Sequence, residues 1–186
     1  MIVLVLLTAL LCGYFLGVRP ALLRSRYKLL YEEELLSSAE EFGLDPYLVC
    51  GVIYTESAFR PQAKSSVGAL GLMQLMPATG IEEAELLGIE GVTEEKLTEP
   101  ALNIRLGCNY LSKLLDEFGS ESVALAAYNA GPGRVRQWLK TYGVKEDGAL
   151  LYIPYPETSK YVSRVQSAKG VYERLYPELA QMNGVN

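Results

Sequence analysis

The chain has no histidine among its 186 residues. This absence excludes nucleophile systems that depend on imidazole, zinc sites with histidine ligands, and acid-base catalysis by imidazole. Any proton transfer must therefore use a carboxyl group, a tyrosine, a lysine or a cysteine.

Cysteine is also scarce, because only Cys12, Cys50 and Cys108 occur, far apart and each among apolar residues. Without a CxxC pair they are typical of small buried side chains rather than of a disulfide framework or a metal site. The chain also lacks a GxxxxGK[ST] phosphate loop, and no GxGxxG motif opens a strand-to-helix unit. We therefore expect no metal and no cofactor.

Positive charge is scarce beyond the first 28 residues. Of the 17 Lys and Arg residues, Arg19, Arg24, Arg26 and Lys28 precede residue 29, so 13 remain against all 22 Asp and Glu residues, a formal charge of −9. Nucleic-acid binding depends on clustered positive charge, so we expect no nucleic-acid partner.

Residues 2–18 form an uncharged apolar run that would span about 26 Å as a helix, slightly less than a hydrocarbon core. We expect an uncleaved N-terminal transmembrane helix, with residues 1–28 as anchor and basic juxtamembrane segment. A cleaved signal peptide is the alternative, but no basic start and no clear cleavage site support it. The positive-inside rule would keep the following domain in the cytoplasm, which conflicts with the location inferred below.

Residues 29–186 suffice for one compact domain with its own core. Apolar residues recur at helical spacing behind Pro100, and sustained strand-like alternation is absent. We expect a single all-α domain with at most a short hairpin or extended segments around 145–156. The predicted helices cover 31–42, 46–55, 81–87, 102–118, 122–128, 134–141 and 159–175.

Glu56 directly follows the apolar helix 46–55, which begins with the N-cap Asp45. With Val52, Ile53 and Phe59 nearby in sequence, its carboxyl group should lie against apolar surface, which raises the pKa. A pKa near ~6 would leave on the order of 10% protonated at pH 7, as a general acid requires. The alternative is a solvated carboxylate at a helix end.

Two further segments combine glycine, proline and polar side chains. In 65–77, two glycines allow close backbone approach, while Met73 and Gln74 offer an apolar contact and an amide that suit an N-acetyl sugar. In 127–135, Tyr128 and Asn129 precede a sharp Gly-Pro-Gly turn. The alternatives are a turn that caps a core and a corner between two helices.

The order of these motifs resembles the soluble lytic transglycosylase family, which has a goose-type lysozyme-like fold. The motifs are E-S-x-F-x-P-x-A-x-S-x-x-G-A-x-G-L-M-Q-L-M-P-x-T from residue 56, A-Y-N-A-G-P-G-R-V from residue 127, and E-T-x-x-Y-V from residue 157. The resemblance covers roughly 31–176. Thr79-Gly80 and the acidic segment 81–87 depart from the family pattern, at the edge of the expected groove.

The resemblance implies a peptidoglycan substrate and makes Glu56 the catalytic acid and then base. The residues that would line the glycan groove are Ser65, Met73, Gln74, Tyr128, Asn129, Glu157 and Tyr161.

The resemblance further implies that one glutamate cleaves the bond between N-acetylmuramic acid and N-acetylglucosamine and leaves a 1,6-anhydromuramoyl end. Asp45 lies about 15 Å along the helix from Glu56, too far to be a second catalytic carboxylate. The distance of Glu157 stays open. A hydrolytic muramidase and a non-catalytic wall-binding scaffold are the alternatives. We expect a monomer in the cell membrane, with its domain facing the wall.

Overall fold

The computed structural model describes residues 7–8, 10–11 and 14–182, and the regular structure in this part of the chain is helical. The helices are α2 (Arg19–Arg26), α3 (Glu32–Glu41), α4 (Pro46–Ser57), α5 (Pro77–Leu86), α6 (Pro100–Phe118), α7 (Glu121–Ala130), α8 (Pro132–Tyr142), α9 (Pro156–Leu175) and α10 (Leu179–Met182), with a π-helical turn η1 (Tyr14–Val18) and a 3₁₀ turn η2 (Lys96–Thr98). The prediction of an all-α domain is confirmed.

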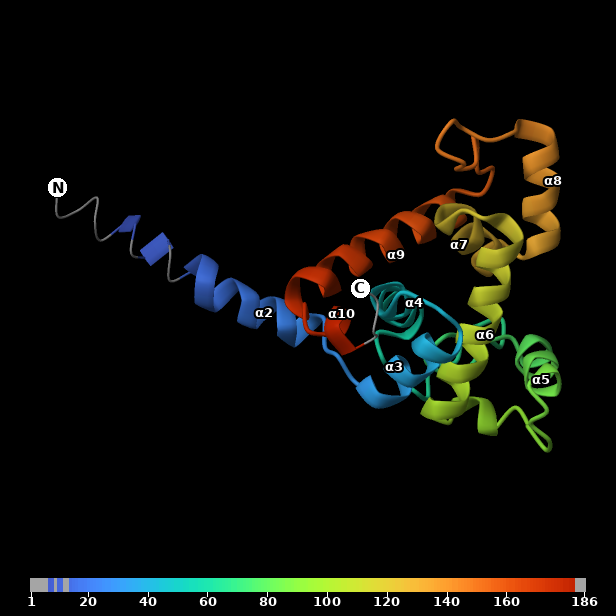
Figure 1. The fold of residues 1–186 in the computed structure, drawn as a ribbon, viewed down its shortest axis with the longest axis horizontal. Helices are drawn as coiled ribbons and strands as arrows, with labels where there is room; N and C mark the ends of the chain where they lie inside the picture. The colour runs from blue at the N-terminus through green and yellow to red at the C-terminus, as the bar shows by residue number, and fades with distance from the viewer. Residues whose placement is uncertain (1–6, 9, 12–13, 183–186) are drawn as a thin grey trace.

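The predicted transmembrane helix 2–18 lies partly outside the described residues. In the described part, none of the helices combines the length and apolar character that crossing a membrane needs. Helix α2 follows η1 directly and projects from the body of the protein toward the N-terminus (Figure 1).

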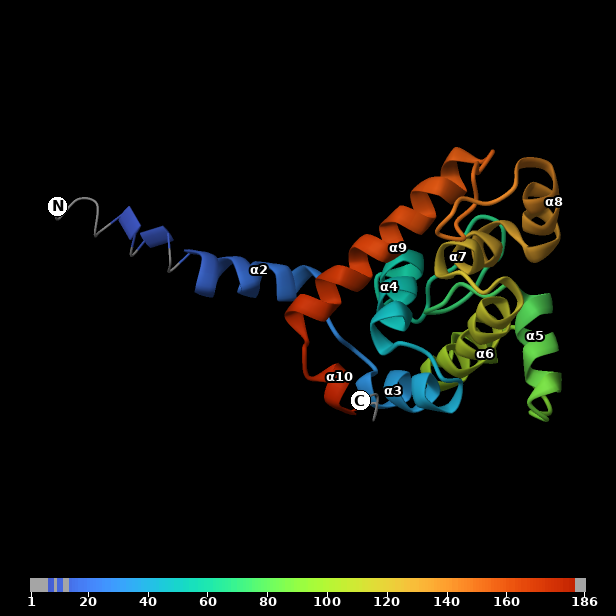
Figure 2. The ribbon, with the colours of Figure 1, turned by 45° about the horizontal axis from the view of Figure 1, so that its top comes forward.

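Helix α4 is the centre of the domain. Its residues 46–53 are all buried, so it is apolar around its whole circumference, as expected of a helix enclosed by others. Helix α9 packs along it, and α3, α6 and α7 complete the surrounding layer through contacts with one another (Figures 1 and 2). A Cβ atom at Gly51 would lie 2.8 Å from the carbonyl oxygen of Val165, so α4 and α9 approach this closely only because residue 51 is glycine.

Two cysteines lie in this core. Cys50 on α4 and Cys108 on α6 are free thiols without solvent exposure, and burial raises the pKa of both. The prediction that these two are buried apolar side chains is confirmed, whereas Cys12 lies outside the described residues.

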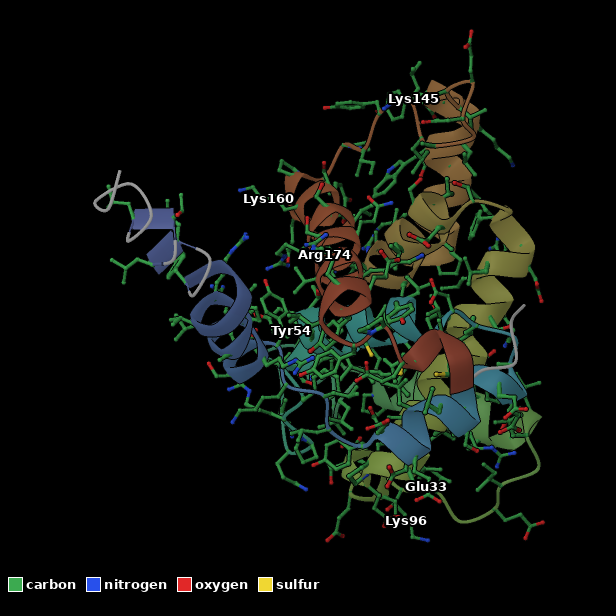
Figure 3. The ribbon with its side chains drawn as sticks, turned by 60° about the vertical axis from the view of Figure 1, so that its left-hand side comes forward. Glu33, Tyr54, Lys96, Lys145, Lys160 and Arg174 are labelled. Carbon is green, nitrogen blue, oxygen red and sulfur yellow. The ribbon has the colours of Figure 1, made fainter. Side chains whose placement is uncertain are left out.

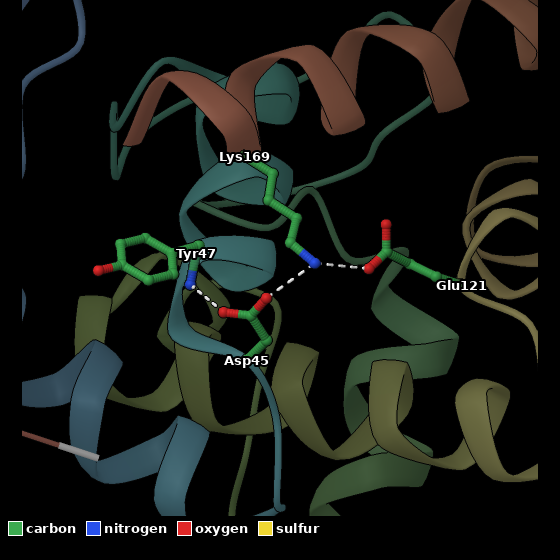
Figure 4. A network of polar contacts seen from close by, with 4 residues as sticks. All are labelled: Asp45, Tyr47, Glu121 and Lys169. Carbon is green, nitrogen blue, oxygen red and sulfur yellow. Dashed lines mark hydrogen bonds and ion pairs between the residues drawn. The ribbon is translucent and has the colours of Figure 1, made fainter. Parts of the chain in front are cut away.

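A polar network holds the start of α4. The Asp45 carboxylate accepts a hydrogen bond from the Tyr47 backbone N–H at 2.9 Å, which confirms the predicted N-cap. Lys169 of α9 donates to both Asp45 and Glu121 of α7 at 2.8 Å each (Figure 4). One lysine thus joins three helices at the end of α4 that lies away from Glu56.

The segment that follows α2 docks onto the helical domain. Tyr27 stacks on Tyr54 of α4, with ring centroids 4.4 Å apart, and its carbonyl oxygen accepts a hydrogen bond from the Tyr176 hydroxyl at 2.8 Å. The Tyr172 hydroxyl donates to the Lys28 carbonyl oxygen at 3.0 Å. Tyr54 lies on the side of the domain that faces α2 (Figure 3). The domain boundary at residue 28 stays a prediction, and residues just before it already contact the domain.

Extended structure is confined to two loops of the described chain. Val144 and Leu150 form an isolated antiparallel bridge, at the edge of the predicted hairpin region. The loop 58–76 between α4 and α5 contains two more bridges, Lys64 with Leu70 and Leu70 with Leu75, which the sequence pattern did not predict. This folded loop covers the C-terminal end of α4.

Candidate functional site

Glu56 occupies the last turn of α4, and the chain turns sharply directly after it. Ala58 and Phe59 both adopt left-handed conformations, with φ of 50° and 60°, which non-glycine residues rarely take. The buried Ser57 hydroxyl lies 2.8 Å from the carbonyl oxygen of Leu72 and so ties the end of the helix to the loop 58–76. Strained backbone of this kind persists where the surrounding structure holds it, often at functional sites.

A pocket of about 500 Å³ lies between this helix end and the loop. Its lining residues are Glu56, Arg60, Gln62, Ala63, Lys64, Ser65 and Gln74. Glu56 is the only acidic residue among the described residues that line it. The structure therefore brings together three of the predicted site residues: Glu56, Ser65 and Gln74.

Burial raises the pKa of Glu56 to about 7, although the nearby Tyr161 hydroxyl and Arg164 guanidinium act to lower it. At that pKa about half of the molecules carry a protonated Glu56 at pH 7. The predicted upward shift is confirmed, and it is larger than the sequence argument assumed.

In addition to the neighbouring loop, two tyrosines from distant helices lie near Glu56. Tyr128 of α7 and Tyr161 of α9 both have a pKa well above the ordinary value, because of burial first and of the Glu56 charge second. Tyr161 is 2% exposed, and its hydroxyl has no hydrogen-bond partner of good geometry among the described residues. The hydroxyl nevertheless acts on the Glu56 carboxyl group, whose pKa it lowers.

Gln74 and Ser65 are held by the loop itself. The Gln74 amide nitrogen donates to the carbonyl oxygens of Ala63 and Gly71, at 3.1 and 2.9 Å, and its backbone has a left-handed φ of 48°. The amide oxygen of Gln74 is thereby left for a ligand. The Ser65 hydroxyl accepts a hydrogen bond from the Ala69 backbone N–H at 2.9 Å.

The prediction that Met73 lines the groove is wrong for its side chain, which is completely buried. The Met73 sulfur fills the space that Gly107 leaves on α6, since a Cβ atom there would lie 2.4 Å from it. Its backbone is nevertheless part of the site frame, because the Met73 carbonyl oxygen accepts a hydrogen bond from the Tyr128 hydroxyl at 2.8 Å. Tyr128 thus fastens α7 to the loop beside Gln74.

The remaining predicted residues lie outside the pocket around Glu56. Asn129 is exposed, and its side-chain oxygen accepts a hydrogen bond from the Thr158 hydroxyl at 2.8 Å. Glu157 is exposed in the first turn of α9, where it lines a separate hollow of about 680 Å³ with Arg164 and other α9 residues. Only Arg164, which acts on the Glu56 carboxyl group, connects this hollow electrostatically with the pocket.

Sequence reasoning missed three residues of the site and its frame. Arg60 lines the pocket and Arg164 faces Glu56, yet both read as ordinary surface arginines in the sequence. Asn103 is completely buried, accepts from the Met73 backbone N–H at 2.7 Å and donates to two further carbonyl oxygens. Asn103 is the only polar side chain among the buried residues of α6, and nothing in the sequence distinguishes it from the exposed polar residues of this helix. Among the described residues, no group of three or more Cys, Asp or Glu side chains is placed to hold a metal ion.

The Transglycosylase SLT domain family model matches residues 35–151, more than half of the chain. The soluble lytic murein transglycosylase of Escherichia coli K12 is 34% identical over 154 residues, which are 81% of this chain and 24% of that protein. The transglycosylase of enterobacteria phage PRD1 is 39% identical over 109 residues, 59% of this chain and 38% of that protein.

Solved structures agree with this match. Lytic transglycosylase Slt from Pseudomonas aeruginosa, an inactive Glu-to-Gln mutant, superimposes with a TM-score of 0.74 at 40% identity and covers 82% of this chain and 25% of its own. The 70 kDa soluble lytic transglycosylase of Escherichia coli gives a TM-score of 0.75 at 33% identity over the same shares. The chain spans about a quarter of the length of the Escherichia coli and Pseudomonas aeruginosa proteins and 38% of the phage protein. By sequence and by fold, it belongs to the transglycosylase SLT domain family.

Proposed function

We propose that this chain is a peptidoglycan lytic transglycosylase that uses Glu56 as its single catalytic acid and base. The observation that carries the proposal is the Glu56 carboxyl group, about half protonated at pH 7, in a pocket without a second acidic residue among its described lining. The Escherichia coli relative is a soluble lytic murein transglycosylase, and the lytic transglycosylase Slt of Pseudomonas aeruginosa is inactive when a glutamate is replaced by glutamine.

In the first step the protonated Glu56 donates its proton to the glycosidic oxygen between N-acetylmuramic acid and N-acetylglucosamine. The bond from that oxygen to the muramic C1 breaks, and positive charge develops on the ring. In the second step the Glu56 carboxylate removes the proton from the C6 hydroxyl of the same sugar as its oxygen bonds to C1. The product is a 1,6-anhydromuramoyl end, no water is consumed, and Glu56 regains its proton.

An internal nucleophile is effective because well-oriented intramolecular groups reach effective molarities of ~10⁵ M or more. The amide oxygen of Gln74, which lines the pocket, is placed to stabilise the developing positive charge, and the Tyr161 hydroxyl acts on the Glu56 carboxyl group. Tyr128 has a different task, because its hydroxyl already holds the Met73 carbonyl oxygen and so keeps the loop in position.

The pocket favours this route over hydrolysis. Hydrolytic glycosidases pair two carboxyl groups, about 5 Å apart or roughly 6.5 to 9.5 Å apart. Asp45 lies at the far end of α4, and Glu157 lines a different hollow. A non-catalytic wall-binding scaffold would have no use for a carboxyl group whose pKa is raised to about 7.

The test is mass spectrometry of the muropeptides that the full chain releases from peptidoglycan, run beside Glu56→Gln. We expect products lighter by one water than reducing-end muropeptides from the wild type, and none from the variant. Reducing ends would show hydrolysis instead, and anhydro products from Glu56→Gln would remove Glu56 from the mechanism.

We also propose that residues 2–18 anchor the chain in the cell membrane, with the helical domain facing the wall. The uncharged apolar run supports an anchor. A relative that is named as membrane-bound also supports it: the membrane-bound lytic murein transglycosylase C of Histophilus somni is 37% identical over 132 residues, which are 64% of this chain and 36% of that protein. The full chain should resist carbonate extraction from membranes, and external protease should degrade its domain in spheroplasts. Release by carbonate or protection from protease would contradict the proposal.

A further inference from the structure

A second pocket, of about 420 Å³, lies beside Glu56 and has no part in the mechanism above. Three separate segments line it: the end of α2 and the residue after it, the last turn of α4, and the middle of α9. Its lining residues are Arg26, Tyr27, Tyr54, Thr55, Ala58, Ser163, Arg164, Ser167 and Ala168. Since Thr55 directly precedes Glu56, this pocket and the catalytic pocket share the last turn of α4.

The lining of this second pocket is electropositive. It contains two arginines, Arg26 and Arg164, and no acidic residue, in a chain whose formal charge is −5. The Arg164 side chain makes no hydrogen bond with any residue that the structure describes, although its charge acts on the Glu56 carboxyl group. The two guanidinium groups are therefore available to an anion from outside the protein.

Tyrosines hold Arg26 in position. Its Nε donates to the Tyr54 hydroxyl at 3.2 Å, and its guanidinium carbon lies 5.7 Å from the centre of the Tyr27 ring. Tyr27 in turn stacks on Tyr54 with an interplanar angle of 24°. Within the described chain, the two terminal nitrogens of Arg26 have no hydrogen-bond partner, so they remain available as donors.

Neutral donors complete the lining. The Thr55 hydroxyl is buried and has no hydrogen-bond partner among the described residues, although buried polar groups are almost always paired. Ser163 and Ser167 add two more hydroxyls on α9. Two guanidinium groups with hydroxyls beside them match the oxygens of a carboxylate, which arginine binds through paired hydrogen bonds.

We propose that this second pocket binds a carboxylate of the peptide that the substrate carries on its muramic acid. The proposal rests on the proposed function, because it takes peptidoglycan as the substrate. The sugars of the glycan backbone are uncharged N-acetylated units, whereas the attached peptides carry free carboxylates. A glycan strand in the catalytic pocket would bring such a peptide to the neighbouring pocket, and Arg26 would make recognition depend on the docked N-terminal segment.

The test compares two substrates and uses the full chain in detergent. One substrate is peptide-bearing glycan strands, and the other is the same strands after an amidase has removed the peptides. We expect Arg26→Gln to lower kcat/KM about tenfold on peptide-bearing strands, mainly through KM, and less than twofold on peptide-free strands. Arg26→Lys should retain part of the effect, because it keeps the charge but not the paired donors.

The matched control is Arg136→Gln, which removes another exposed arginine, on α8, far from both pockets in the chain. It should behave as the wild type on both substrates. Peptide-free strands still carry the lactyl carboxylate of muramic acid, so an equal loss on both substrates would place the contact there and overturn the proposal. No loss on peptide-bearing strands would overturn it as well.

A binding measurement separates this proposal from the proposed reaction. Calorimetric titration with a free murein tetrapeptide needs no turnover, and we expect Arg26→Gln and Arg164→Gln each to weaken binding about tenfold. If the wild type cuts neither substrate but binds the tetrapeptide in this way, the reaction is wrong and the pocket assignment stands. If it cuts strands but shows no binding that depends on Arg26, the pocket assignment fails alone.

Discussion

The two ends of α4 each carry an acidic residue, and their environments are opposite. Asp45 caps the N-terminal end, accepts a backbone hydrogen bond and pairs with Lys169. Glu56 lies in the last turn, has no ion pair with any described residue, and has a pKa of about 7. The positive N-terminal end of a helix favours a carboxylate, and the negative C-terminal end disfavours it. One helix thus holds one carboxylate for stability and one carboxyl group for proton transfer.

The largest expected effect on activity comes from removing the acid at the Glu56 end of α4 without changing its shape. Glu56→Gln should lower cleavage by roughly 10³-fold, because general acid-base catalysis contributes about 10² to 10⁴. Asp45→Asn is the matched control, since asparagine also caps helices, and it should retain nearly full activity. Release of anhydromuropeptides measures both. Equal losses of activity in the two variants would mean that cleavage depends on the integrity of α4 rather than on the Glu56 proton.

The free energy of unfolding should fall more steeply with rising pH in the wild type than in a variant without Glu56. Its folded pKa, about 7, lies above the unfolded value of about 4.3, so the folded state binds more protons between these values. Its contribution to stability is complete below pH 4.3 and is lost as the pH rises through 7, by up to about 4 kcal/mol.

Urea unfolding at pH 5 and at pH 8 measures this loss. Glu56→Gln should lack this share of the decline and should therefore be more stable than the wild type at pH 8. An identical pH dependence in the two proteins would contradict a raised pKa of Glu56.

Removing the ion pairs at the N-terminal end of α4 should have a smaller effect, and this effect should concern stability alone. Lys169→Met leaves Asp45 and Glu121 without their shared partner, and we expect a loss of about 1 to 2 kcal/mol. Urea unfolding measures the loss, and the midpoint of the pH-activity curve should not move. A shifted midpoint would show that the two ends of α4 are coupled.

The smallest expected effect is a change in the pKa of Glu56 when the neighbouring Tyr161 hydroxyl is removed. The Tyr161 hydroxyl lowers the Glu56 pKa, so Tyr161→Phe should move the alkaline midpoint of kcat/KM upward by less than about one pH unit. Tyr142→Phe, on the exposed part of α8, is the control and should leave the midpoint in place. A downward shift in Tyr161→Phe would contradict the assigned role of the hydroxyl.

Much of the fold was predictable because its signals are local. Proline at the start of α4, α6 and α9 and glycine after α6 mark helix ends, and the apolar periodicity of α6 lies within a few turns. The bridges in loop 58–76 were not predictable in this way, since they depend on left-handed residues such as Gln74 that no local rule favours.

The residues of the candidate site likewise divide into those that local sequence predicted and those that depend on distant parts of the chain. The motifs pointed to Glu56, Ser65 and Gln74, which share one pocket because the helix end and the loop are close in the chain. The burial of the Met73 side chain was not predictable, because the space that it fills is left by Gly107 on another helix.

By itself, the sequence determined that no imidazole takes part, that a lone glutamate follows an apolar helix, and where most helices lie to within a few residues. The predicted helices 81–87 and 159–175 begin four and three residues after the observed starts of α5 and α9. Only the tertiary structure decided what surrounds that glutamate. Tyr161 and Arg164 come from α9 and lower the pKa of Glu56, whereas burial by the surrounding structure raises it. Desolvation and Coulomb interactions depend on distance in space, and side chains adjacent in a helix point to different faces.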